Sequence, residues 1–249
     1  MRYLLFLLPI LLIPNAWAEV SIQNDQQYLG NDGSYHIVGE IYNDLDAPIT
    51  QIEISSMLYA NSEPVSSATT GSLVNTIMPG MKGPFEILVT GKDVSHIDSY
   101  VLSLDYKVSS PKNQVIDVID SKISRDAHNN LMITGTVANK GDITANIVSV
   151  IATLYDKSGN VAAVERIHTA PDYLRSNSEA FFLVPIPDKT QSNTVVDYSL
   201  VAESEEYAAV PEFPLGTSLL FVSSVISYVI FTKYPNRLIA NLVSAADPK

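Results

Sequence analysis

A long segment of this sequence returns once, 96 positions later and without a gap. The segment starts at Ile37-Val38-Gly39-Glu40-Ile41-Tyr42-Asn43 and runs to Tyr59. Identical residues recur at the shifted positions, where Ile133, Gly135, Asn139, Asp142, Leu154 and Tyr155 stand for Ile37, Gly39, Asn43, Asp46, Leu58 and Tyr59. The same offset carries Phe85 onto Phe181. The repeat predicts two copies of one module, each of about 90 to 100 residues.

Apolar residues alternate with polar ones in both copies, and this period of two is typical of β-strands. Turn residues arrive every eight to twelve positions or so, which favours many short strands over helices. The sequence therefore predicts an all-β fold of two tandem β-sandwich domains, residues 19–110 and 111–208, joined near residues 109–113. The expected strands include 20–22, 35–42, 49–59, 85–89, 100–108, 115–124, 131–139, 143–155, 161–168, 181–184 and 195–202, with turns at Glu63-Pro64 and Asp156–Asn160.

Two residue types inside the repeat have local structural interpretations. Gly39 and Gly135 lie within expected strands, where a glycine often marks the close approach of another backbone or a bulge. Asn43 and Asn139 come at strand ends, where an asparagine side chain bonds to nearby backbone groups. We expect structural roles for all four residues.

The first 18 residues have the features of a secretory signal peptide. Arg2 provides the positive start, residues 4–13 are apolar apart from Pro9, and Ala16-Trp17-Ala18 fits a cleavage site before Glu19. The alternative is an uncleaved N-terminal anchor.

A second apolar segment, Leu215–Thr232, follows a 209–214 linker and is long enough to span a thin bilayer as a helix. Lys233 and Arg237 follow it, whereas the preceding residues are acidic. The positive-inside tendency then predicts a single-pass membrane protein with a short cytoplasmic tail, 233–249, and both β domains outside the cell. The alternative is a buried helix of a soluble domain.

The chain has a formal charge of −12, and residues 19–212 hold 26 acidic and 11 basic side chains. Such a surface repels nucleic acid and anionic lipid, so we expect no nucleic-acid partner. The acidic charge serves solubility or, alternatively, recruits cations or basic partners. The chain has no cysteine, which excludes disulfides and thiolate metal sites.

We find no motif that carries catalysis. The histidines His36, His96, His128 and His168 form no metal-binding pattern, and the sequence has neither a nucleophile elbow nor a phosphate-binding glycine loop. A Ser–His–Asp triad assembled across strands remains an alternative, because triad members need not be close in sequence. The prediction is a protein that is not an enzyme, with no catalytic, cofactor-binding or metal-binding residues and no cofactor.

Two binding alternatives remain open on particular residues. Acidic and amide side chains on turns offer the oxygen ligands that calcium prefers, at Asn31-Asp32-Gly33, Asp44, Asp46, Asp126 and Asn129. Most turns of this composition are simply turns. Tyr59 and Tyr155, at equivalent strand ends, are candidates for packing or for a carbohydrate-binding rim.

The repeated pattern resembles the FxLYD-type and related immunoglobulin-like β-sandwich domains of prokaryotic surface proteins. It consists of Gly-x-Ile/Val-x-Asn, an apolar strand ending in Leu58-Tyr59 or Leu154-Tyr155, and a strand with Phe85 or Phe181. The resemblance implies two immunoglobulin-like domains that serve in adhesion, spacing or assembly. Pro211-Glu212-Phe213-Pro214, the apolar span and the basic residues resemble the PEF-type C-terminal sorting signals of archaeal surface proteins. That resemblance implies an archaeal source, with the segment either processed or retained in the membrane.

The sequence thus predicts a non-catalytic, membrane-anchored extracellular structural or interaction protein of a cell envelope. Its expected partners are the bilayer, through Leu215–Thr232, and other proteins at the cell surface. The alternative is an accessory single-span subunit of a membrane complex whose partners carry the chemistry.

Overall fold

A computed structural model describes residues 19–91, 94–186 and 188–211 of the chain. In these residues the fold is all-β and built from several antiparallel sheets, which confirms the predicted class. The predicted signal peptide, the 215–232 span, the 233–249 tail and the end of the 209–214 linker lie outside the described residues. Within the described ranges, no helix has the length and apolar character needed to cross a bilayer.

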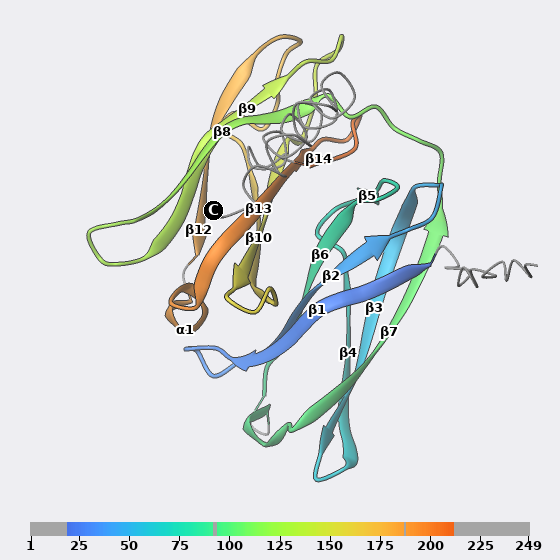
Figure 1. Ribbon diagram of the computed structural model, residues 1–249, viewed down its shortest axis with the longest axis vertical. Coiled ribbons are helices and arrows are strands. Elements are labelled where there is room, and N and C mark those ends of the chain that lie inside the picture. The colour runs from blue at the N-terminus through green and yellow to red at the C-terminus, as the bar shows by residue number, and fades with distance from the viewer. Residues whose placement is uncertain (1–18, 92–93, 187, 212–249) are drawn as a thin grey trace, which may run out of the picture. The chain divides into compact units, whose positions relative to one another are not determined.

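The first half of the described chain forms two sheets (Figure 1). One has the order β1-β2-β6; in the other, β3 lies at the centre and pairs with β4, β5 and β7. The elements are β1 (Val20–Leu29), β2 (Tyr35–Asn43), β3 (Ile49–Ala60), β4 (Glu63–Gly71), β5 (Thr76–Ile77), β6 (Lys82–Val89), η1 (Val94–His96) and β7 (Ser99–Val108).

The second half follows a similar plan, with sheets of order β12-β9-β8 and β11-β10-β13-β14. Its elements are β8 (Ile116–Arg125), β9 (Leu131–Asn139), β10 (Ser149–Asp156), β11 (Val161–His168), β12 (Glu179–Ile186), α1 (Lys189–Ser192), β13 (Val195–Glu203) and β14 (Val210–Pro211).

Each half encloses its own apolar core, made by the inward residues of alternating strands. Fully buried side chains from both sheets meet there, because successive residues of a strand point to opposite faces. The first core includes Ile37, Ile41, Ile54, Leu58 and Phe85, and the second includes Ile133, Val137, Val150, Leu154 and Phe182.

The pairing registers of the two halves correspond, but not at one constant offset. Gly39 pairs with Phe85, and Gly135 pairs with Phe182, so the partner of the glycine is displaced by 97 residues. The alignment of Phe85 with Phe181 is therefore wrong by one position. Because a one-residue slip moves a side chain to the opposite face, Phe182 is buried whereas Phe181 is 55% exposed.

The last strands are displaced by one residue more. Leu58 pairs with Tyr100 and Leu154 pairs with Tyr198, an offset of 98 between the two tyrosines. Length differences in the loops absorb these shifts, which sequence alignment without gaps does not detect.

The expected turn at Glu63-Pro64 is also wrong. The chain reverses at Asn61 and Ser62, whose φ angles of 52° and 67° suit the tight turn of a β-hairpin. Glu63 and Pro64 then begin β4, which pairs along β3. This strand was missed because Glu63–Gly71 is polar and lacks the apolar alternation that identified the others.

The long strand expected over 143–155 begins only at Ser149. Residues before it form a loop that includes Ile147 at a φ of 50° and one isolated bridge between Ala145 and Leu174. Apolar residues in this loop gave a strand-like pattern without strand pairing.

The predicted roles of Asn43 and Asn139 are confirmed. The Asn43 amide donates to the carbonyl oxygens of Ala47 and Ile77 at 3.0 and 2.9 Å. The Asn139 amide donates in the same way to Ile143 and Leu174 at 2.8 and 2.9 Å. Both side chains are buried and replace backbone bonds that the strand ends lack.

We predict that Gly135→Ala destabilises the protein more than Gly39→Ala does. A Cβ at residue 135 would lie 2.2 Å from the Asp120 carbonyl oxygen, a backbone atom that cannot rotate away. At residue 39 the nearest atoms belong to the Phe85 ring, 2.8 Å away. We expect Gly135→Ala to lower the free energy of unfolding by about 2 to 3 kcal/mol in urea denaturation.

Gly71→Ala is the matched control, since its nearest neighbour would be the Ile52 carbonyl oxygen at 3.5 Å, an ordinary contact. We expect a change within about 0.5 kcal/mol. Equal losses in Gly135→Ala and Gly71→Ala would contradict the close-approach explanation.

Candidate functional site

The richest group of buried polar residues lies where the two halves meet. Val38 on β2 contacts Val161 and Val164 on β11, and Ile151 and Val201 of the second half join the core cluster of the first half. β2 is therefore buried on both faces, one toward its own core and one toward the other half. Charged groups are enclosed within this apolar contact.

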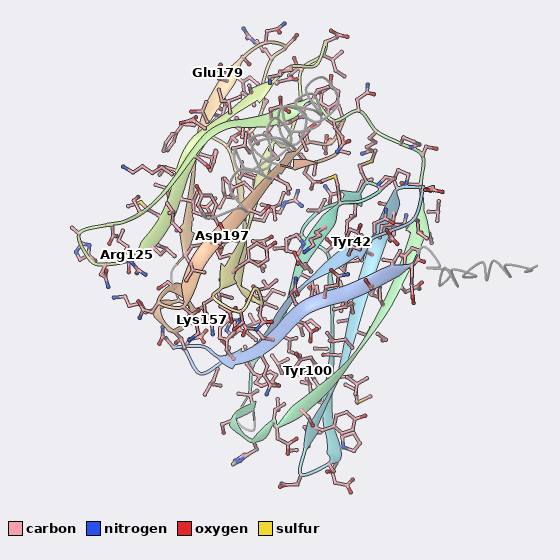
Figure 2. All side chains as sticks on the ribbon, in the orientation of Figure 1. Tyr42, Tyr100, Arg125, Lys157, Glu179 and Asp197 are labelled. Atoms are coloured by element: carbon pink, nitrogen blue, oxygen red, sulfur yellow. The ribbon has the colours of Figure 1, made fainter. Side chains whose placement is uncertain are left out.

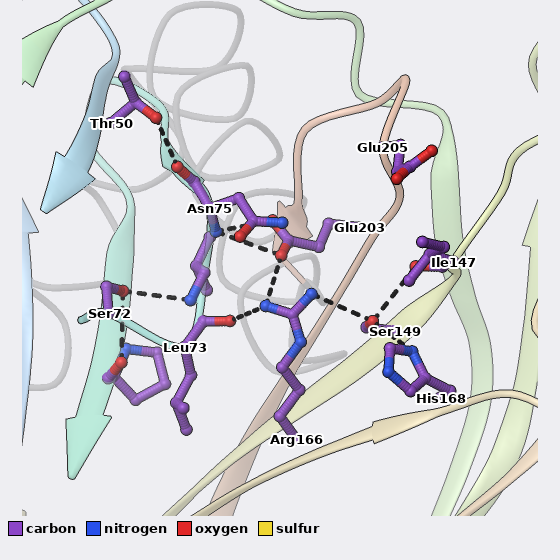
Figure 3. Close-up of polar contacts among 12 residues, drawn as sticks. Thr50, Ser72, Leu73, Asn75, Ile147, Ser149, Arg166, His168, Glu203 and Glu205 are labelled. Atoms are coloured by element: carbon purple, nitrogen blue, oxygen red, sulfur yellow. Dashed lines mark hydrogen bonds and ion pairs between the residues drawn. The ribbon is translucent and has the colours of Figure 1, made fainter. Parts of the chain in front are cut away.

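Arg166 and Glu203 form an ion pair within this contact (Figure 3). The Arg166 Nη1 atom lies 3.0 Å from Glu203 Oε1 and also donates to the Leu73 carbonyl oxygen at 2.5 Å. The backbone N–H of Asn75 donates to both Glu203 oxygens at 3.1 and 3.2 Å. Arg166 and Glu203 belong to the second half, and their backbone partners belong to a loop of the first.

Burial raises the pKa of Glu203 to about 7. Only 1% of its side chain is exposed, and removal from water penalises the charged carboxylate more than the neutral acid. The Arg166 charge and the Asn75 N–H bonds act in the opposite direction and favour the carboxylate. Burial is the larger effect, and it places the pKa near neutrality.

A second buried carboxylate, Glu40 on β2, collects partners from both halves. It accepts bonds from Asn24 Nδ2 at 2.6 Å, Lys82 Nζ at 2.5 Å and the Tyr155 hydroxyl at 2.9 Å. Burial, and next the negative charge of Glu40, raises the pKa of Tyr155. The hydroxyl therefore stays protonated and donates across the contact.

A Ser–His–Glu chain occurs at the start of β2. The Ser34 hydroxyl lies 2.7 Å from His36 Nε2, and His36 Nδ1 lies 2.8 Å from Glu86 Oε1. This connectivity is that of a catalytic triad with a glutamate as its acid. However, Ser34 is only 3% exposed, and its hydroxyl donates to Asp32. With its proton directed at a carboxylate and its oxygen buried, Ser34 is not arranged as a nucleophile. The His36 ring also stacks on Tyr28, with centroids 4.5 Å apart.

The remaining histidines do not come together. His96 and His128 are exposed, at the end of η1 and on a turn, and His168 lies at the end of β11 with Nδ1 3.0 Å from the Ser149 hydroxyl. No group of three or more metal-ligating side chains occurs among residues 19–91, 94–186 and 188–211.

The acidic turns bond to themselves. Asp126 accepts the N–H groups of His128 and Asn130 at 2.8 Å each, and Asp32 accepts the Ser34 N–H at 2.9 Å. The Asn130 N–H bond to Asp126, and the Ser34 hydroxyl bond to Asp32, hold the pKa of each carboxyl below its usual range. Asp44 and Asp46 are exposed on the turn after β2. These geometries are those of turn-stabilising side chains.

Two hollows lie among the described residues. The larger, about 610 Å³, is lined by residues from both halves: Thr50, Asn75, Thr76, Ser109, Ser110, Pro111, Lys112 and Glu205. The smaller, about 200 Å³, lies in the first half, near the start of β4 and the end of β6: Val65, Ser66, Val89, Thr90, Gly91, Val94 and Ile97.

Sequence reasoning missed Glu40, Arg166 and Glu203 as important residues. One available signal was the charge of Glu40 within a mostly apolar strand, on the face opposite Ile37, Gly39 and Ile41. Sequence reasoning did identify Tyr155, as a packing or rim residue, but not the buried carboxylate of Glu40 to which Tyr155 bonds.

Comparison with known proteins identifies no family. No family profile matches the chain, and no characterised protein matches it in sequence. Solved structures with a similar arrangement include the exo-chitosanase CsxA of Amycolatopsis orientalis, at 11% identity and a TM-score of 0.29. The match covers 78% of this chain and 26% of that one.

A β-D-mannosidase of Dictyoglomus thermophilum matches at 10% identity and a TM-score of 0.27, over 72% of this chain and 28% of that one. Red sea bream transglutaminase matches at 9% identity and 0.24, over 77% and 29%. This chain spans less than a third of the length of each of these three proteins, and likenesses at these TM-scores carry no argument about function.

We predict that Tyr155→Phe destabilises the protein by about 1 to 2 kcal/mol, because Glu40 loses a donor while staying buried. Tyr59→Phe is the matched control: Tyr59 holds the equivalent position on β3, and among the described residues its hydroxyl has no bonding partner. Urea denaturation compares the two variants. Equal stabilities would show that the Tyr155 bond to Glu40 contributes nothing.

The raised pKa of Glu203 predicts a pH-dependent stability. Its folded pKa of about 7 lies above the ordinary value of 4.5, so the folded protein binds the extra proton between these limits. This contribution is complete below about pH 4.5 and is lost as the pH rises through about 7. We expect the stability of wild type relative to Glu203→Gln to fall by about 1 to 3 kcal/mol between about pH 5 and pH 8.

Glu179→Gln, which removes an exposed carboxyl group, is the control and should follow the wild-type pH profile. A constant stability difference between wild type and Glu203→Gln across this range would contradict the raised pKa.

Proposed function

We propose that this chain is a non-catalytic structural or interaction protein, anchored in a cell membrane and displaying two tandem immunoglobulin-like β-sandwich modules outside the cell. In this proposal the 1–18 segment is a removed signal peptide, Leu215–Thr232 spans the bilayer and 233–249 is cytoplasmic. The resemblance of residues 211–237 to PEF-type signals favours an archaeal envelope.

The observation that carries the proposal is how the candidate polar groups are used. Glu40, Arg166 and Glu203 bond across the contact between the halves, and Asp32 and Asp126 bond to the backbones of their own turns. Ser34, in the triad-like chain, is buried and donates to Asp32. Polar groups used in this way stabilise the fold, so we infer that the protein acts by binding other molecules through its exposed surface.

The matching registers of the two halves support the tandem arrangement. Val20 pairs with Asn43 and Ile116 with Asn139, each joining the first strand of a half to the end of the second. In each half a tyrosine hydroxyl bonds to a residue on the first strand of that half, which belongs to the other sheet. Tyr100 on β7 bonds to Asp25 on β1, and Tyr198 on β13 bonds to Ser121 on β8.

The test is fractionation of cells that express the full chain. We expect the protein in the membrane fraction after a carbonate wash, and we expect protease added to intact cells to digest residues 19–210. Val222→Arg combined with Ile226→Arg should release the protein from the membrane, since a central arginine is costly in a membrane span.

Ser224→Leu with Ser227→Leu, which makes the same segment more apolar, is the control and should stay membrane-bound. Soluble wild-type protein that resists protease in intact cells would overturn the proposal. Crosslinking that recovers a stoichiometric integral-membrane protein would instead favour the role of an accessory subunit.

A further inference from the structure

The outer edge of β7 is open along its whole length among the described residues, whereas a two-residue strand, β14, pairs with part of the corresponding edge of β13. β7 pairs with β3 on one side, and no strand within the described residues pairs with its other side. In the second half β14 pairs with β13, on the side away from β10. After β7 the chain instead leaves toward β8, with Ser109 bonded to the Pro48 carbonyl oxygen.

The inward residues of β7 are less buried than those of β13. Leu102 and Leu104 are only half-buried, whereas their counterparts Leu200 and Ala202 on β13 are fully buried. Tyr100 and Tyr106 flank the leucines and are also half-buried. Tyr100 is labelled in Figure 2. A further strand beside β7 would cover this row of apolar side chains.

The outward face of β7 carries two charged side chains, Asp105 and Lys107, and is otherwise uncharged. The strand runs for ten residues without a proline, and Val101 and Val108 are 59% and 62% exposed. β4, the edge strand on the other side of the same sheet, is polar and carries Pro64. Long edge strands with exposed apolar residues and no proline are where extended segments add to a sheet.

The charge beside this edge selects the kind of segment. Asp105 lies directly opposite Glu53 on the solvent face, and like charges in opposed positions repel each other. Lys107, opposite Thr50, is the one basic side chain on this face of β7, so the acidic pair lies at Asp105 and Glu53. Residues 19–110 hold 12 acidic side chains against 3 lysines, a net charge of −9. A second copy of this chain would bring the same net negative charge, whereas a basic side chain on an added strand would lie next to the acidic pair Asp105 and Glu53.

We propose that the β7 edge binds an extended segment of a partner protein in which apolar residues alternate with lysine or arginine. The apolar side chains cover Leu102 and Leu104, the backbone extends the sheet, and a basic side chain pairs with Asp105. This inference rests on the proposed function and names the surface and partner chemistry through which it acts.

The probe is a labelled ten-residue peptide in which valine alternates with lysine and threonine, added to the full-length protein in detergent micelles. We expect saturable binding by fluorescence anisotropy, and amide hydrogen exchange over residues 99–108 slowed by about tenfold or more. N-methylation at alternate positions removes hydrogen-bond donors along one edge and should abolish binding, as should glutamate in place of lysine.

Two variants with the same change in net charge separate the edges. Asp105→Lys on β7 should weaken peptide binding by about tenfold, whereas Glu63→Lys on β4 should change it by less than about twofold. Equal effects of the two substitutions, or exchange protection outside β7, would overturn the inference. So would self-association of the protein through β7, which makes a second copy the occupant.

The fractionation experiment keeps the two proposals separate. A protein retained in the membrane that does not bind the peptide at β7 overturns this inference alone. A cytosolic, protease-resistant protein overturns the proposed function, whatever the peptide does.

Discussion

The enclosure of two carboxylates between apolar surfaces constrains the whole described structure. Glu40 and Glu203 are each 1% exposed, and a charge removed from water loses several kcal/mol unless bonding partners compensate it. The partners come from both halves: Asn75 of the first bonds Glu203 of the second, and Tyr155 of the second bonds Glu40 of the first. Each half thus supplies groups that the other requires, which fixes how the two halves meet.

This dependence explains why β2 departs from the usual alternation of a sandwich strand. Its odd-numbered residues face the core of the first half, as in any strand with one buried face. Its even-numbered residues Val38 and Glu40 are equally buried, because the second half covers them. At β2, the face that points away from the core of the first half is therefore buried against the second half. Sheet edges and loops remain as accessible surface.

The path of the chain after β7 and after β13 determines what lies beside each strand. The two strands occupy equivalent places, yet the chain continues differently after each. After β13 it turns back through Tyr207 and Ala209, both buried, to β14; after β7 it crosses to the other half. Because the chain crosses to the other half after β7, no counterpart of β14 lies beside β7 among the described residues.

The sequence determined the all-β class, most strand positions and the roles of Asn43 and Asn139, because alternation and turn chemistry are local properties. It misplaced Phe181 because loop lengths shift the register, and it missed β4 because that strand is polar. It also did not identify Glu40, Arg166 or Glu203, although it did mark Tyr155, the partner of Glu40. Whether a charged residue on an outward face meets water or a second apolar surface depends on how two distant segments pack, and only the tertiary structure decides that.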